Sequence, residues 1–123
     1  MKKIKTLGLS IITGAILGSS PAIAGSFLGA EYQVGKNKVA FLSEQSRIAG
    51  NVFLPPDYNR SNSYPALVVI TPASGVKEQT AGIYAEKLAK KGYITLAFDH
   101  RTYGESGGFP RGMENALMKV EDI

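Results

Sequence analysis

The sequence contains no cysteine and only one histidine, His100. A chain without cysteine forms no disulfide bond and carries no lipid on a cysteine, so its fold depends on packing alone. One histidine among scattered carboxylates has no ligand spacing. The sequence therefore indicates no metal site.

No hydrophobic run is long enough to span a bilayer, which takes about 20 apolar residues. The apolar run LGLSIITGAIL, residues 7–17, follows three lysines and precedes the small-x-small triplet AIA, residues 22–24. This order is typical of a secretory signal peptide over residues 1–24, cleaved after Ala24. An uncleaved membrane anchor is the alternative. We expect the mature part, residues 25–123, to be periplasmic or secreted and to have no stable membrane anchor.

Little net charge remains once the signal peptide is removed. The whole chain has a net charge of +4, but the signal contributes three lysines and no acidic residue. The mature part therefore has 11 basic and 10 acidic residues, a net charge of +1. Binding of nucleic acid would need a basic face. We expect no nucleic-acid partner.

The mature sequence alternates between strand and helix patterns. Two β-prone runs, residues 38–43 and 47–55, flank EQS and predict a β-hairpin. The runs ALVVIT, residues 66–71, and YITLAF, residues 93–98, suit strands buried on both faces. Between them, residues 80–91 predict a helix with one apolar stripe. The residues of that stripe are Ala81, Tyr84, Ala85, Leu88 and Ala89.

Strand, helix and strand in this order predict a right-handed βαβ unit with a parallel sheet. A Gly-rich loop, residues 99–112, follows, and residues 113–123 begin a second helical pattern. The apolar side of this pattern consists of Met113, Ala116, Leu117 and Val120. A buried parallel strand needs helices on both faces. We therefore expect the α/β class, with a hairpin and a parallel βαβ unit forming the incomplete front part of a larger domain.

GESGG, residues 104–108, matches the G-x-S-x-G pattern of a nucleophile elbow. An elbow holds its serine on a tight turn directly between a buried strand and a helix. Here five residues separate the strand from GESGG, and FPRG follows it. The adjacent Asp99 and His100 point to opposite sides, so Asp99 is badly placed to orient the imidazole. We therefore do not assign Ser106 as a nucleophile.

The chain resembles the α/β-hydrolase superfamily, in the branch similar to dienelactone hydrolases. The resemblance lies in AGNVFLP, PALVVITPASGVKEQTAGIYAEKLAKKGY, ITLAFDHRTYGESGG and VEDI. In that family, the loop after the second parallel strand reads D-x-R-G-x-G-x-S and shapes one wall near the active site. The matching residues here are Asp99, Arg101, Gly104 and Ser106, and Thr102 stands where the family usually has glycine. The resemblance implies a structural role for this loop.

The resemblance also implies half of an oxyanion hole in the loop TPASGV, residues 71–76. In the family, this loop gives a backbone N–H to the oxyanion that forms during acyl transfer. By position, Ala73 is the expected donor and Ser74 the next. An ordinary strand-to-helix turn is the alternative.

The triad of this fold follows the order nucleophile, acid, histidine. The resemblance places all three beyond Ile123 and leaves serine or cysteine open as the nucleophile. It implies an exported hydrolase for a small-molecule ester or lactone, with no dissociable cofactor. The alternative is a catalytically inactive remnant or a non-catalytic binding fragment.

Overall fold

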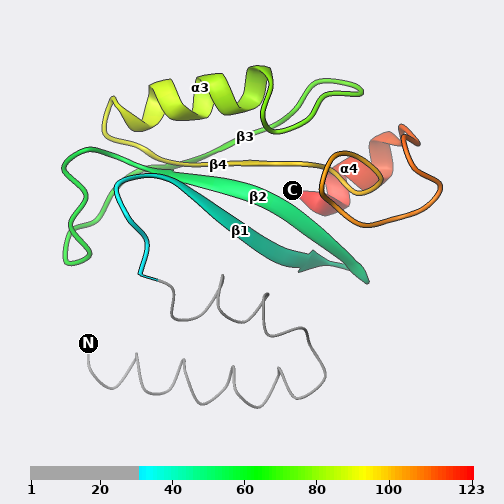
Figure 1. The fold of residues 1–123 in the computed structure, drawn as a ribbon, viewed down its shortest axis with the longest axis horizontal. Helices are drawn as coiled ribbons and strands as arrows, with labels where there is room; N and C mark the ends of the chain where they lie inside the picture. Colours follow the sequence, from blue (N-terminus) through cyan, green and yellow to red (C-terminus); the bar gives the residue numbers. More distant parts are fainter. Residues whose placement is uncertain (1–30) are drawn as a thin grey trace, which may run out of the picture. The chain divides into compact units, whose positions relative to one another are not determined.

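The computed structural model describes residues 31–123, which contain four strands and two helices (Figure 1). They follow one another as β1 (Gly35–Ser43), β2 (Ser46–Leu54), β3 (Ala66–Val69), α3 (Thr80–Ala89), β4 (Ile94–Phe98) and α4 (Ala116–Asp122). The expected signal peptide, residues 1–24, lies outside these residues. Within residues 31–123, no helix has the length and apolarity needed to cross a membrane.

The predicted hairpin is formed by β1 and β2, which pair antiparallel from Gly35 opposite Leu54 to Ser43 opposite Ser46. Its turn contains only two residues, and the first of them, Glu44, has φ 51°. Two-residue hairpin turns favour a positive φ at this position because the resulting turn matches the twist of the strands.

The strand order in the sheet is β1-β2-β4-β3. β4 pairs antiparallel with β2 and parallel with β3, which confirms the parallel βαβ unit. β4 lies inside the sheet, and its Thr95 and Ala97 are fully buried. The expectation that the β3 run is buried on both faces is wrong for the described residues, because β3 lies at the edge with one neighbouring strand. There Leu67, Val68 and Ile70 are exposed, Val68 to 48%.

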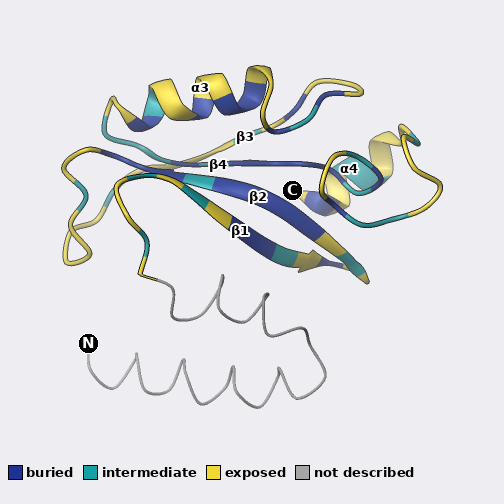
Figure 2. Cartoon of the chain, in the orientation of Figure 1, coloured by how far each residue is buried: buried dark blue, intermediate teal, exposed yellow. Residues whose placement is uncertain are grey.

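The helix α3 covers one face of the sheet and turns its buried side toward that face (Figure 2). The buried cluster between them consists of Phe53, Ala81, Ala85, Ala89 and Ala97. The hydroxyl of Thr95 donates a hydrogen bond of 2.8 Å to the Ala85 carbonyl, so helix and strand are in close contact. The small apolar residues of the predicted stripe therefore do form the inward face.

The predicted inward position of Tyr84 is wrong, since its side chain is 58% exposed. Gly82 is buried instead. A Cβ at Gly82 would collide with the main-chain carbonyl oxygen of Lys77. The loop before α3 thus lies so close to the helix that this position has no room for a side chain.

The helix α4 begins three residues after Met113, where the sequence pattern placed its start. The Asn115 side chain caps it by accepting hydrogen bonds from main-chain N–H groups of the first turn. The side predicted to be apolar is exposed, with Leu117 at 76% and Val120 at 70%, because no described element packs against it. The buried residue of α4 is the acidic Asp122.

Candidate functional site

Two loops follow the carboxyl ends of the parallel strands β3 and β4. Residues 70–79 connect β3 to α3, and residues 99–115 connect β4 to α4. Because the two strands run parallel, both loops lie at the same edge of the sheet. Ligands of open α/β sheets bind at this edge. The two loops therefore define the candidate site.

A buried lysine, Lys77, joins the two loops. Its N–H donates to Oδ1 of Asp99 and its Nζ donates to Oδ2, each at 2.7 Å. The same Nζ donates to Oε2 of Glu105 at 2.7 Å and lies 3.2 Å from Oε2 of Glu78. The side chains of Lys77 and Asp99 are 2% and 0% exposed. Burial by itself would lower the pKa of Lys77, but its hydrogen bonds to Asp99 and Glu105 raise that pKa above the usual value.

Gly104 allows the second loop to fold over the Asp99 carboxylate. Its φ is 50°, and a Cβ at this position would collide with that carboxylate. The next N–H, of Glu105, donates to Oδ2 of Asp99 at 2.9 Å. Asp99 thus accepts hydrogen bonds from both loops, and its charge is compensated inside the protein.

The sequence departs from the family pattern at Thr102, and the structure shows how the turn accommodates it. Thr102 has φ 75°, which is unusual for a β-branched residue. Its hydroxyl donates to the Met113 carbonyl at 2.9 Å, and its N–H donates to the Gly107 carbonyl at 2.6 Å. These hydrogen bonds hold the residue in the conformation that glycine would adopt freely.

Ser106 is buried and fastens the second loop to β2. Its Oγ donates to the Asp99 carbonyl at 2.5 Å and accepts from the Ala49 N–H at 2.9 Å. The residue is 4% exposed and is followed by loop rather than by helix. GESGG therefore has no nucleophile-elbow geometry in the structure.

His100 is buried as well and makes no hydrogen bond with Ser106. Its ring lies edge-on to Phe98, with centroids 5.0 Å apart, and its Nδ1 is 3.5 Å from Oδ2 of Asp122. Neither ring nitrogen forms a hydrogen bond within residues 31–123. Burial lowers the pKa of His100, and the nearby Lys119 lowers it further, so the ring is neutral at neutral pH.

Arg101 ties the second loop to α4 through Asp122. Its N–H donates to Oδ2 of Asp122 at 2.8 Å and its Nε donates to Oδ1 at 2.7 Å. Its guanidinium also donates to the Ser43 hydroxyl at 3.0 Å. Burial would raise the pKa of Asp122, but these hydrogen bonds from Arg101 lower it below its usual value.

Sequence reasoning assigned no role to Lys77 or Asp122. Both are charged residues, and lysine and aspartate are almost never fully buried unless paired. A sequence pattern therefore predicts that both lie on the surface. The one signal that pointed to them was the family resemblance, since GVKEQ and VEDI belong to the matching stretches.

The two expected oxyanion donors, the N–H groups of Ala73 and Ser74, differ in their hydrogen bonding within residues 31–123. Pro72 to Gly75 form a turn closed by a 3.0 Å hydrogen bond from the Gly75 N–H to the Pro72 carbonyl. Ser74 has φ 57°, and its N–H donates to Oε2 of Glu114 at 3.0 Å. Ala73 is exposed, and its N–H has no hydrogen-bond partner within residues 31–123. Of the two donors, Ala73 is the one open to an external anion.

Glu114 lies in the second loop and reaches the first. Its Oε1 is 2.6 Å from Nζ of Lys119, while its Oε2 accepts from Ser74. These two hydrogen bonds, that of Lys119 first, lower the pKa of Glu114. The carboxylate is therefore charged and paired at neutral pH.

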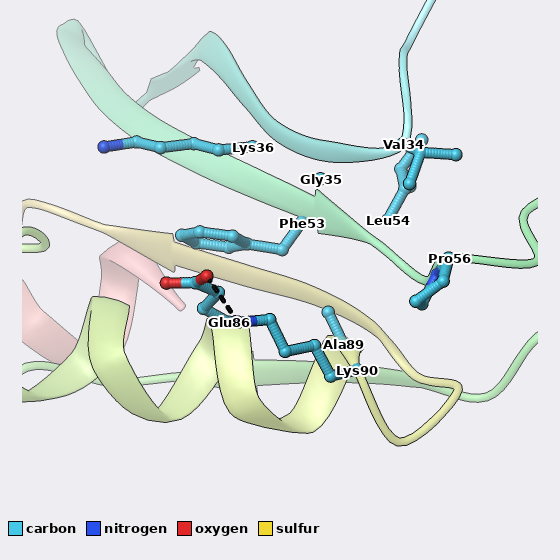
Figure 3. Close-up of a pocket in the computed structure, with 9 residues that line it drawn as sticks. All are labelled: Val34, Gly35, Lys36, Phe53, Leu54, Pro56, Glu86, Ala89 and Lys90. Carbon is cyan, nitrogen blue, oxygen red and sulfur yellow. Dashed lines mark ion pairs between the residues drawn. The ribbon is translucent and has the colours of Figure 1, made fainter.

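A hollow with a volume of about 320 Å³ lies away from the two loops, between the hairpin and α3 (Figure 3). Phe53, in its lining, pairs with Thr95 at the start of β4, so this hollow is at the other end of the sheet from the two loops. Its Glu86 and Lys90 pair with each other at 2.9 Å. Across residues 31–123, no group of acidic or histidine side chains is arranged to hold a metal ion.

The chain is similar to known proteins over part of their length. No family model matches the chain. Over 90 residues the chain is 44% identical to the uncharacterized protein YcjY of Escherichia coli K12, which covers 71% of this chain and 29% of YcjY. Over 58 residues it is 41% identical to the thiohydrolase aneE of Aspergillus aculeatus, covering 47% of this chain and 18% of aneE. The chain thus spans less than a third of either relative.

Solved structures decide the fold. The crystal structure of the hypothetical protein PA2218 from Pseudomonas aeruginosa matches 76% of this chain, with a TM-score of 0.67 and 36% identity, over 29% of its own length. The α/β hydrolase GrgF from Penicillium sp. sh18 matches 72% of this chain, with a TM-score of 0.63 and 24% identity, over 29% of its own length. The chain has an α/β-hydrolase fold. Its hairpin and βαβ unit match the N-terminal portion of that fold, which confirms the expected α/β class for the described residues, while the expected signal peptide stays a prediction.

Proposed function

We propose that the chain is the N-terminal part of an exported hydrolase of the dienelactone-hydrolase-like branch. The proposed enzyme cleaves small-molecule esters or lactones with a triad whose nucleophile, acid and histidine lie beyond Ile123. The α/β-hydrolase fold and the similarity to a thiohydrolase support a hydrolase in general. The order of basic start, apolar run and small-x-small site supports export.

The observation that carries the proposal is the Ala73 N–H at the carboxyl edge of the sheet, which has no hydrogen-bond partner within residues 31–123. When a nucleophile attacks an ester carbonyl, the carbonyl oxygen becomes negative and needs hydrogen-bond donors already in place. A single such donor stabilises the transition state by about 2.7–4 kcal/mol in enzymes where one was removed. A main-chain donor on a small, exposed residue meets this need, and the substrate can approach it closely.

The buried ion pairs have a supporting part in this proposal. A donor is effective only if its position varies by about 0.5 Å or less. Lys77 fixes the first loop to Asp99, and Arg101 fixes the second loop to Asp122. The chain then supplies a rigid wall and one oxyanion donor, and the reacting groups come from elsewhere in the enzyme.

Removal of the Ala73 N–H tests the proposal. Ala73 is the second residue of a turn whose third residue, Ser74, is left-handed, and proline is favoured at that second position. Ala73→Pro therefore removes the donor and keeps the turn. In the protein expressed from its complete reading frame, we expect kcat for p-nitrophenyl acetate and butyrate to fall by about 10²- to 10³-fold. Ala73→Gly, which keeps the N–H, is the matched control.

Other outcomes would change the assignment. A wild type that turns over neither these esters nor a lactone supports the inactive or binding alternative. Equal kcat values in Ala73→Pro and Ala73→Gly would remove the oxyanion role. Turnover that disappears in a correctly folded Ser106→Ala variant would make GESGG the nucleophile motif after all.

The exported protein should begin at Gly25 by mass spectrometry, and an intact Met1 would contradict cleavage after Ala24.

A further inference from the structure

We propose that Glu114 is a positioning residue for the oxyanion turn: its carboxylate holds the Ser74 N–H and, with Lys119, orients the Ala73 N–H as the donor. This inference rests on the proposed function and adds a residue to the same site. Glu114 lies 40 positions from Ser74 in the sequence, so only the fold brings them together.

The hydrogen bonds of the turn show how the orientation is set. In a trans peptide unit the carbonyl and the N–H point in opposite directions. The Pro72 carbonyl and the Ala73 N–H belong to one such unit, and the carbonyl accepts from the Gly75 N–H at 3.0 Å and from Lys119 Nζ at 3.4 Å. These donors on one side of the peptide direct the Ala73 N–H to the other side.

The next peptide unit is held by Glu114 itself. Ser74 occupies the left-handed region at φ 57°, which a side chain with a Cβ adopts only at a cost. The 3.0 Å hydrogen bond from its N–H to Oε2 of Glu114 favours this conformation over the flipped peptide. Glu114 also keeps Lys119 close to Pro72 through their 2.6 Å ion pair. Loss of Glu114 therefore frees the Ser74 N–H and removes the hold on Lys119, so the first peptide unit keeps only its hydrogen bond from the Gly75 N–H.

The charge of Glu114 is compatible with an oxyanion nearby. The groups that face its carboxylate are Lys119 on α4, Tyr103 in the second loop and the Ser74 N–H. Lys119 neutralises the carboxylate directly. The pair therefore orients the turn and adds no net charge that would repel the developing oxyanion.

Kinetics of three variants in the protein from its complete reading frame test this inference. Glu114→Ala removes the acceptor, and we expect kcat to fall roughly 10- to 100-fold with KM within about 2-fold, as small misplacements of catalytic groups do. Glu114→Gln keeps an acceptor oxygen and should recover most of the loss. Glu86→Ala is the control, because Glu86 also pairs with a lysine, Lys90, but lies on α3 beside the distant hollow. Thermal unfolding of each variant checks that it is folded.

A measurement without substrate separates this inference from the proposed function. The amide proton of Ser74, followed by NMR between pH 6 and 3, should shift as Glu114 titrates below its usual pKa, and the shift should vanish in Glu114→Gln. A Ser74 amide that does not report this titration overturns the contact. An active wild type whose kcat is unchanged in Glu114→Ala overturns the positioning role. A wild type without turnover overturns the proposed function and the catalytic part of this inference, whereas the titration still decides whether Glu114 holds the turn.

Discussion

Lys77 is buried, although a charged lysine ordinarily lies at the surface. A lysine is strongly hydrated, and loss of water around its ammonium group is costly unless charges and hydrogen bonds replace that water. Here Asp99, Glu105 and Glu78 surround the ammonium group, and Asp99 is itself fully buried. The two buried charges depend on each other, so either one alone would be unfavourable.

We expect Lys77→Met to destabilise the protein by about 3–5 kcal/mol, because it leaves the buried Asp99 carboxylate without its partner. Lys38 is the matched control, since it also pairs with Glu105, at 3.5 Å, but its side chain is 73% exposed. Lys38→Met should cost no more than about 1 kcal/mol. Urea unfolding at pH 7 measures both changes. Similar losses in the two variants would show that the buried pair has no special weight.

The elements of the fold followed from the sequence, but the exposure of some of their side chains did not. The turn residues and β-branched runs predicted the hairpin and the βαβ unit, and Ala81, Ala85 and Ala89 do face the sheet. Tyr84 and the β3 residue Val68 are exposed against expectation. Periodicity reports which side of an element is apolar, whereas burial depends on which neighbours lie against that side.

In the helix α3, we expect replacement of a glycine by alanine to have the opposite effect on stability from the usual one. Replacing glycine by alanine inside a helix ordinarily stabilises it by about 0.5–1 kcal/mol. At Gly82 the added Cβ collides with the Lys77 carbonyl, so we expect Gly82→Ala to destabilise the protein by about 1–3 kcal/mol instead. Lys87→Ala, at an exposed position of α3, should stay within about 0.5 kcal/mol. A stabilised Gly82→Ala variant in urea unfolding would contradict this packing.

For the molecule as a whole, a change of folding stability between pH 7 and 5.5 can be assigned to one side chain, because the sequence has a single histidine, His100. Burial lowers the pKa of His100 in the folded protein below the usual 6.5. Below pH 6.5 the unfolded chain therefore takes up a proton that the folded protein does not, so stability is present above this pH and is lost as pH falls toward the folded pKa.

The predicted loss of stability from pH 7 to 5.5 is at most about 1.4 kcal/mol per pH unit, since one group is involved. His100→Gln removes the titrating group and should flatten the slope in this range, whatever its effect on absolute stability. Urea unfolding at a series of pH values compares the two slopes. An equally steep slope in His100→Gln would assign the effect to other groups.

The amino-acid sequence alone determined the α/β class, the hairpin, the parallel βαβ unit and the loops that follow its strands, because these depend on local periodicity and turn residues. It also showed that GESGG lies in the wrong local context for a nucleophile elbow. Only the tertiary structure decided that Lys77 and Asp122 are buried and that Ser74 is held by Glu114. It also decided that the Ala73 N–H has no partner among the described residues 31–123. The hydrogen bonds of Lys77 with Asp99, Asp122 with Arg101 and Ser74 with Glu114 join residues 21 to 40 positions apart, and no local pattern encodes a partner at that distance.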